Sequence, residues 1–334
     1  MSDYADPRNW LEMTKKTGMA LGLQNTSQLL KLLDLNLSNT TIIHVAGSNG
    51  KGTLCALLAT NFTLIDQSNV LFSSPHLCRV EERIRVDGVP VGADLFDEAV
   101  KRIQLVSLAS NIIPTFFEVT FLTAMIIASK TNVKFLILET GLGGRLDATR
   151  CAPADLALLT SISMEHTDIL GGEINQIIKE KAAIARPGKP IIARVMNTID
   201  YQKIVEDVAQ NCYQSIIDGE KQPAQCHFID IPDGTTARKE AHILAERALA
   251  ILNQKSMLED AEELLNWPGR LQRISLPSGH KMILEAAHNP TGLAKIIPEL
   301  INLIDSEYNT RKTCIIFATS PQQDMTAMLD GIAT

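Results

Sequence analysis

Short apolar runs alternate with segments of helical periodicity along most of this chain. Runs rich in branched aliphatic residues predict buried strands at residues 41–46, 69–73, 133–138, 156–160 and 190–195. Helical patterns lie around and between them at residues 10–23, 26–35, 53–59, 95–110, 119–129, 173–185, 197–210, 237–253 and 257–265. This alternation predicts an α/β fold, in which a mostly parallel sheet is covered by helices on both faces.

The pattern is interrupted near residue 266. A Trp-Pro-Gly-Arg segment at 267–270 breaks the helical periodicity, and we place a domain boundary there, between a domain at 1–266 and another at 267–334. The second domain contains predicted strands at 282–287 and 313–318 and predicted helices at 291–303 and 324–332. Two β-α units bury too little apolar surface to be stable alone, so we expect a smaller, partial Rossmann-like α/β domain. The polar segment 211–236 carries no pattern that we can assign.

A glycine-rich segment, Gly-Ser-Asn-Gly-Lys-Gly-Thr at residues 47–53, directly follows the first predicted strand and opens a predicted helix. Strand, loop and helix in this order predict a phosphate-binding loop. Backbone N–H groups at the helix start would surround a polyphosphate, Lys51 would reach the β- and γ-phosphate oxygens, and the Thr53 hydroxyl would face Mg²⁺. The competing interpretation, a glycine-rich turn with an incidental lysine, is weaker because both flanking elements are present.

Composition restricts the kinds of partner. The 334-residue chain is 45% hydrophobic and 21% charged, and its net charge of -7 argues against nucleic acid or an anionic membrane as a partner. Six scattered cysteines without a C-x-x-C pair indicate reduced thiols. There is no signal-peptide pattern and no apolar run approaching the roughly 18 residues of a membrane span. We expect a cytoplasmic monomer that acts on small molecules.

Polar side chains stand at the ends of three predicted strands. Ser74, Glu139 and His166 each follow such a strand, and the carboxyl ends of parallel strands meet at one edge of a sheet. A hydroxyl, a carboxylate and an imidazole beside a phosphate loop predict a Mg²⁺ site, although imidazole is unusual for so hard a cation. Each residue alone is more often a helix cap or a core residue, so the prediction depends on their shared edge.

Seven sequence blocks in order carry a family resemblance. They are residues 47–53, 74–84, 139–149, 165–171, 180–184, 268–270 and 285–290. Together these blocks resemble the folylpolyglutamate synthase/dihydrofolate synthase family, which belongs to the ATP-dependent Mur ligases. The resemblance covers roughly residues 15 to 325 and implies an ATP-dependent amide ligase. It would add L-glutamate to dihydropteroate, to a folate, or to both, through an acyl phosphate.

The resemblance also implies roles for individual residues. The ATP-binding residues would be Ser48, Asn49, Gly50, Lys51, Gly52, Thr53, Arg270 and Glu285. Two Mg²⁺ ions would be held by Ser74, Glu139, His166 and Lys181. The pterin or folate would contact Thr115, Phe116, Phe117, Glu118, Leu146, Asp147 and Ala148. The catalytic groups would be Lys51, Lys181 and His288, with His288 near the incoming amine or the phosphate.

Lys181 allows two interpretations. In the family the matching lysine is modified to a carbamate that ligates the second Mg²⁺, whereas the sequence alone favours a surface lysine paired with Glu180. An ammonium beside two divalent cations would be repelled by several kcal/mol at an effective dielectric constant of about 20, while a carbamate supplies an anionic oxygen. We therefore predict that Lys181 is carbamylated.

Two alternatives to this function stay open. Ala20 occupies a position where the family usually has aspartate, which favours a related ligase joining another amino acid to another carboxylate. The short second domain favours a catalytically weak nucleotide-binding relic, although the presence of Lys51, Glu139, His166 and Lys181 argues against it.

Overall fold

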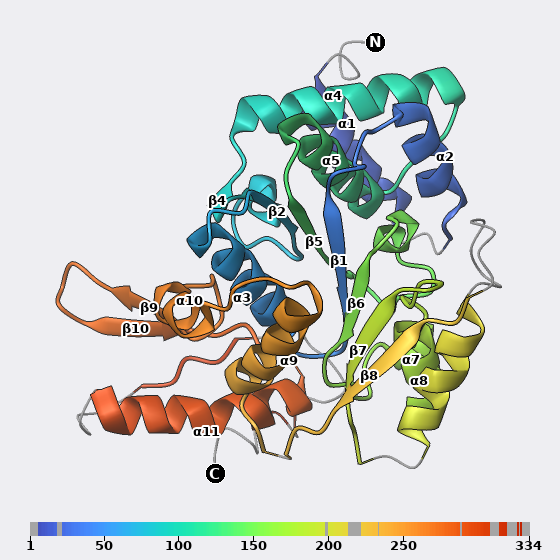
Figure 1. The fold of residues 1–334 in the computed structure, drawn as a ribbon. Coiled ribbons are helices and arrows are strands. Elements are labelled where there is room, and N and C mark those ends of the chain that lie inside the picture. Colours follow the sequence, from blue (N-terminus) through green and yellow to red (C-terminus); the bar gives the residue numbers. More distant parts are fainter. Residues whose placement is uncertain are drawn as a thin grey trace.

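The computed structural model describes residues 6–18, 22–197, 200–212, 222–232, 234–287, 289–307 and 314–318, together with Thr326 and Met328. An eight-stranded sheet lies at its centre (Figure 1). Its strands are β1 (Thr41–Ala46), β2 (Asn69–Phe72), β3 (Ile84–Val86), β4 (Val89–Pro90), β5 (Phe135–Glu139), β6 (Leu156–Leu159), β7 (Pro190–Arg194) and β8 (Gln225–Ile229). Their order is β4-β3-β2-β5-β1-β6-β7-β8, with parallel pairing from β2 to β8 and antiparallel pairing of β3 and β4. The predicted mostly parallel α/β sheet is confirmed.

Helices cover both faces of the sheet because successive side chains of its buried strands point to opposite faces. Ile42 of β1 packs in a cluster with helices α1 (Pro7–Thr14), α2 (Gln24–Leu33), α4 (Ala93–Ser110) and α5 (Phe116–Thr131). Ile43 packs on the opposite face with α3 (Lys51–Leu64), α9 (Ala237–Ile251) and α10 (Leu258–Leu264). A third cluster joins β6 and β7 to α7 (Ile174–Ala182) and α8 (Tyr201–Gln210). Short helical turns are η1 (Lys15–Thr17), η2 (Val80–Arg83), η3 (Ala148–Cys151) and α6 (Thr167–Leu170).

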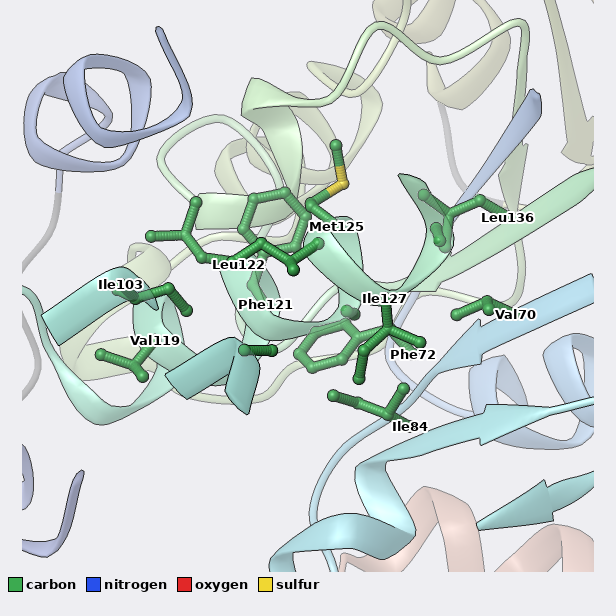
Figure 2. Close-up of a cluster of buried hydrophobic side chains, with 14 of the residues drawn as sticks. Val70, Phe72, Ile84, Ile103, Val119, Phe121, Leu122, Met125, Ile127 and Leu136 are labelled. Carbon is green, nitrogen blue, oxygen red and sulfur yellow. The ribbon is translucent and has the colours of Figure 1, made fainter. Parts of the chain in front are cut away.

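Helix α5 is the most deeply buried element of the first face. Its residues Phe121 and Met125 pack among side chains from the sheet, including Phe72 of β2 (Figure 2). The rings of Phe72 and Phe121 meet edge to face with centroids 6.0 Å apart, a favourable arrangement for aromatic pairs. Such a helix needs a well-defined start, and the Thr115 side chain caps it by accepting a hydrogen bond from Glu118 N. This packing fixes the end of α5 that faces the candidate site.

Three strands of the large sheet, the two-residue β4 and the longer β3 and β8, were missed by the sequence pattern. The unassigned segment 211–236 contains β8, and the charged segment before residue 86 contains η2 and β3. Strands β3 and β8 are only partly buried along most of their length, and β8 lies at an edge of the sheet. Partly buried strands do not require a continuous apolar run, which is why periodicity did not reveal them.

The segment after residue 266 differs from the predicted Rossmann-like arrangement. Strands β9 (Gln272–Ser275) and β10 (Lys281–Leu284) pair antiparallel as a separate two-stranded sheet, followed by α11 (Pro290–Glu307). A five-residue connection allows a hairpin, whereas parallel strands need a long crossover. The predicted strand at 313–318 is wrong for residues 314–318, and most of the predicted helix 324–332 lies outside the described residues. The boundary at residue 266 stays a prediction.

Helix α11 is joined to the large sheet by a buried polar network. Lys295 of α11 donates hydrogen bonds to Ser161 Oγ (2.7 Å) and Glu240 Oε2 (2.8 Å). The same Glu240 oxygen pairs with Arg194 Nη1 at 2.7 Å, and the Glu240 side chain is 3% exposed. One buried carboxylate thus connects α9, β7 and α11.

In the described part of the chain, no helix is long and apolar enough to cross a membrane.

Candidate functional site

The carboxyl ends of β2, β5, β1 and β6 meet at one edge of the sheet, as the sequence predicted. Glu139, the last residue of β5, lies opposite Val45 of β1, one residue before that strand ends. The backbone N–H of Ser74, just after β2, donates to Glu139 Oε2 at 3.1 Å. The neighbouring positions of β2 and β5 therefore bring Ser74 and Glu139 together, while His166 lies on the segment that follows β6.

The glycine-rich loop has a conformation that its sequence requires. Gly47 has φ +148°, and a Cβ there would lie 1.9 Å from Thr160 Oγ1, so any other residue would be strained and would displace the Thr160 side chain just after β6. Gly50 adopts the left-handed conformation and caps α3, which begins at Lys51. The first N–H groups of a helix lack intrahelical partners and carry partial positive charge. The loop therefore presents N–H donors suited to an anion.

Two lysines converge on this loop. Lys51 Nζ donates to the carbonyl oxygen of Gly47 at 2.7 Å, and Lys181 Nζ donates to the same oxygen at 3.1 Å. Lys181 is 1% exposed, so the surface interpretation of this residue is wrong. Its partner is Glu165, at 2.6 Å, while Glu180 pairs with Arg145. Burial and the nearby charge of Lys51 lower the pKa of Lys181 to about 8.

Glu165 is a site residue that the sequence reasoning missed. Burial disfavours its ionised form, but the charges of Lys181 and Lys51 outweigh this effect, and the pKa of Glu165 is lowered. The available signal was its position beside His166 at the end of a predicted strand. His166 itself is exposed and adopts a left-handed backbone conformation before α6.

The oxygen-bearing side chains beside the loop suit a hard divalent cation that takes only a few ligands from the protein. Glu139 is 5% exposed, and burial raises its pKa, although Lys51 and the Ser74 N–H oppose this shift. A cation would stabilise this buried carboxylate, and Thr53 lines the same cavity. No group of three His, Cys, Asp or Glu residues suited to a metal occurs among the described residues. Mg²⁺ usually keeps several waters and takes one or two carboxylates plus phosphate oxygens, so this small donor set is compatible with it.

A single cavity of about 640 Å³ brings most of the predicted site residues together. Eighteen of the predicted residues line it: Ser48, Asn49, Gly50, Lys51, Gly52, Thr53, Ser74, Thr115, Phe116, Phe117, Glu118, Glu139, Leu146, Asp147, Ala148, His166, Arg270 and Glu285. Lys181 lies beside the loop but does not line the cavity. His288 and Ala20 lie outside the described residues.

The cavity wall also carries two aromatic rings, those of Phe116 and Phe117. Phe117 packs edge to face on Phe72, with centroids 5.7 Å apart. A Cβ on Gly141 would lie 2.5 Å from the Phe117 ring, so glycine is needed at this approach. Both Phe116 and Phe117 are partly buried and line the cavity, so they are available to stack on a flat ligand.

Two carboxylates assigned to the pterin are occupied by structural hydrogen bonds. Glu118 accepts from Thr26 Oγ1 at 2.7 Å with one oxygen and from Thr115 N at 2.7 Å with the other. The Asp147 carboxylate accepts from four donors: the backbone N–H groups of Gly141 and Leu142, and both the N–H and the hydroxyl of Thr149. Four donors fill the lone-pair sites of a carboxylate, so Asp147 organises the loop after β5 rather than offering a free acceptor.

The segment after residue 266 closes one side of the cavity. Arg270 Nη1 and Glu285 Oε1 lie 3.2 Å apart, and Glu285 Oε2 accepts from Leu271 N at 2.8 Å. Asn289 Nδ2 donates to Asn49 Oδ1 of the phosphate loop at 3.3 Å. Trp267, which the sequence analysis treated only as part of a segment that breaks the helical periodicity, also lines the cavity.

Comparison with known proteins gives one family model and several similar chains. The model of the Mur ligase middle domain matches residues 45–240. The dihydrofolate synthase/folylpolyglutamate synthase of Bacillus subtilis (strain 168) is 29% identical, covering 99% of this chain and 83% of that protein. The protein of the same name from Escherichia coli (strain K12) is 30% identical, covering 89% and 74%.

Solved structures show the same fold. Escherichia coli FolC in complex with DHPP and ADP superposes with a TM-score of 0.75 at 28% identity, covering 89% of this chain and 75% of that one. A bifunctional folylpolyglutamate synthase/dihydrofolate synthase from Yersinia pestis, complexed with AMPPNP and Mn ion, superposes with a TM-score of 0.74 at 28% identity. The match covers 90% of this chain and 76% of that one. The nucleotides and the metal ion were bound to those relatives.

Proposed function

Because this chain belongs to the Mur ligase family, and within it to the dihydrofolate synthase/folylpolyglutamate synthases, we propose that it is an ATP- and Mg²⁺-dependent ligase that joins L-glutamate to dihydropteroate, to a reduced folate, or to both. The observation that carries the proposal is the single cavity lined by both the phosphate loop and the rings of Phe116 and Phe117. A reaction between a nucleotide and an aromatic carboxylic acid needs both binding regions in one enclosure.

The reaction has two steps. A carboxylate oxygen of the acceptor attacks the γ-phosphorus of ATP, the bond to the bridging oxygen breaks, and ADP leaves. The amine of L-glutamate then attacks the acyl carbon, the bond to the phosphate oxygen breaks, and phosphate leaves as the amine loses a proton. Lys51 and the N–H groups at the start of α3 hold the phosphates and stabilise negative charge on the transferring group.

The cation would be held by Glu139, Thr53 and Ser74, with Lys181 joining the ligands once it is carbamylated, while a role for His166 stays a prediction. When bound, Mg²⁺ neutralises phosphate charge and helps to align the transferring phosphoryl group. Lys51 acts independently of the metal as a fixed cation beside the loop. Glu165 holds Lys181 through the 2.6 Å ion pair and so positions it next to the Gly47 carbonyl.

In the same cavity, the Phe116 and Phe117 rings would stack on the pterin or the aminobenzoyl ring. Asp147 and Glu118 would shape this region indirectly, because their oxygens hold the loop after β5 and the start of α5. Arg270 and Glu285 would contact the nucleotide from the segment after residue 266, and His288 stays a candidate for the amine or phosphate side of the reaction.

The decisive experiment compares acceptors. Purified protein is incubated with ATP, Mg²⁺ and L-glutamate together with either dihydropteroate or tetrahydrofolate, and products are identified by mass spectrometry. Gain of one or more glutamyl residues, with equal release of phosphate, is the expected result. If neither acceptor gains glutamate, the proposal is wrong for these substrates. A different amino acid joined to a different carboxylate would support the alternative that Ala20 favours.

A further inference from the structure

Arg83 occupies an unusual position at the end of η2. The residue is only 9% exposed and lines the cavity, yet no carboxylate lies within ion-pair distance of it in the part of the chain that the structure describes. Burying a guanidinium without an anionic partner is costly, and burial lowers the pKa of Arg83 to about 10, with partial compensation by the charge of Glu139. An anionic ligand in the cavity would remove this cost.

The guanidinium is held in one orientation with its outer nitrogens available. Its Nε donates to His76 Nδ1 at 2.8 Å, whereas its two terminal nitrogens make no hydrogen bond with any described residue. A ring nitrogen that accepts from a guanidinium carries no proton, so His76 acts here through an unprotonated Nδ1. A guanidinium anchored through Nε presents Nη1 and Nη2 as a pair, which suits bidentate binding of a carboxylate.

A second cation stands at the same aromatic ring. Lys15 Nζ lies 4.9 Å and Arg83 Cζ 5.3 Å from the centroid of the Phe116 ring. Lys15 is paired with Glu12 at 2.7 Å, but its side chain is 47% exposed and able to turn towards a ligand. The local arrangement is therefore an aromatic ring flanked by two positive groups, in the same cavity as the loop that would hold phosphate.

We propose that Arg83, held by His76 and assisted by Lys15, binds a glutamyl carboxylate: one that stays intact during ligation rather than the one that becomes activated. The inference rests on the proposed function, which supplies ligands with such carboxylates. Two sources share this chemistry, namely the incoming L-glutamate and the glutamyl group already present on a folate. Dihydropteroate has no glutamyl group, and this difference makes the source testable.

The test measures KM for L-glutamate, tetrahydrofolate, dihydropteroate and ATP in Arg83→Gln, with Arg83→Lys and Arg79→Gln as companions. Arg79 is an exposed arginine in the same segment and does not line the cavity, so its substitution should leave all four KM values near those of the wild type. Loss of a charge-assisted bidentate contact should raise the affected KM by about 10- to 100-fold in Arg83→Gln. Arg83→Lys keeps the positive charge but lacks the paired terminal nitrogens of the guanidinium, so it should give an intermediate increase in KM.

The pattern of changes identifies the source. A higher KM for L-glutamate with either acceptor assigns Arg83 to the incoming amino acid. A higher KM for tetrahydrofolate, with those for dihydropteroate and L-glutamate unchanged, assigns it to the glutamyl group of the acceptor.

Three results would overturn the inference: unchanged KM values for both glutamyl substrates, an increase for ATP alone, or equal increases for dihydropteroate and tetrahydrofolate without one for L-glutamate. If Arg83→Gln does not fold, as judged by thermal melting, Arg83→Lys decides the question. Absence of any ligation by the wild type would instead refute the proposed function.

Discussion

Carbon dioxide reacts with the neutral form of an amine, so the protonation of Lys181 decides how readily a carbamate forms there. With a pKa of about 8, about half of the Lys181 side chains are neutral at pH 8, against about 0.3% for an ordinary lysine with a pKa of 10.5. The neutral fraction rises as pH increases through 8 and falls about tenfold for each pH unit below 7. The buried site therefore favours the reacting form by more than about a hundredfold.

The neighbouring carboxylate opposes the product. Glu165 Oε1 lies 2.6 Å from Lys181 Nζ, and converting the ammonium to a carbamate replaces attraction by repulsion between two anions. Two unit charges about 4 Å apart interact by about 4 kcal/mol at an effective dielectric constant of about 20. A divalent cation bound to the carbamate would offset this repulsion. We therefore expect Lys181 to be carbamylated in the presence of Mg²⁺ and nucleotide, and largely unmodified without them.

The assay is ¹³C NMR with ¹³C-labelled bicarbonate at several pH values, with and without Mg²⁺ and ADP. A carbamate signal should appear with both ligands, increase between pH 6 and 8, and be absent in Lys181→Ala. Lys179→Ala, which changes an exposed lysine of the same helix, should keep the signal. Activity should depend on bicarbonate, and acetate should partly rescue Lys181→Ala. No signal at pH 8 in the Mg²⁺–ADP complex, together with full activity in buffer free of carbon dioxide, would refute the reasoning.

Three further predictions concern the loop and the polar network. Lys51→Ala should lower kcat by at least about 100-fold with an unchanged melting temperature, because it removes the fixed cation at the phosphates; a loss below tenfold in steady-state assays would contradict the phosphate-loop assignment. Gly47→Ala should destabilise the protein by about 3 kcal/mol in urea unfolding, because its Cβ would collide with the Thr160 side chain. Gly88→Ala, with open space around it, should cost only about 1 kcal/mol. Glu240→Gln should lower the free energy of unfolding by about 3 to 5 kcal/mol, because it removes the carboxylate that Arg194 and Lys295 share. Glu98→Gln, at an exposed ion pair, should lower it by less than about 1 kcal/mol. Equal losses in denaturant titration would contradict a special contribution of the buried network.

The local sequence pattern was sufficient to predict a feature whose functional groups and secondary-structure elements are adjacent in the sequence. The apolar run at 41–46, the glycines of the loop and the following helix formers specified β1, the phosphate loop and α3 without reference to the rest of the chain. The positions of Ser74 and Glu139 at strand ends predicted their shared edge, because parallel strands converge there whatever their order.

Other features depended on partners far away in the chain. Lys181 reads as a surface lysine next to Glu180, and only the folded chain brings it to Glu165 and Gly47 and buries it. Asp147 reads as a free acceptor, but its four donors belong to the loop that it organises.

The orientation of Arg83 between His76 and Phe116 was likewise decided by tertiary structure. Periodicity records which side of an element is apolar. Burial, ion pairing and shifted pKa values instead arise from the surroundings that a side chain meets after the chain has folded.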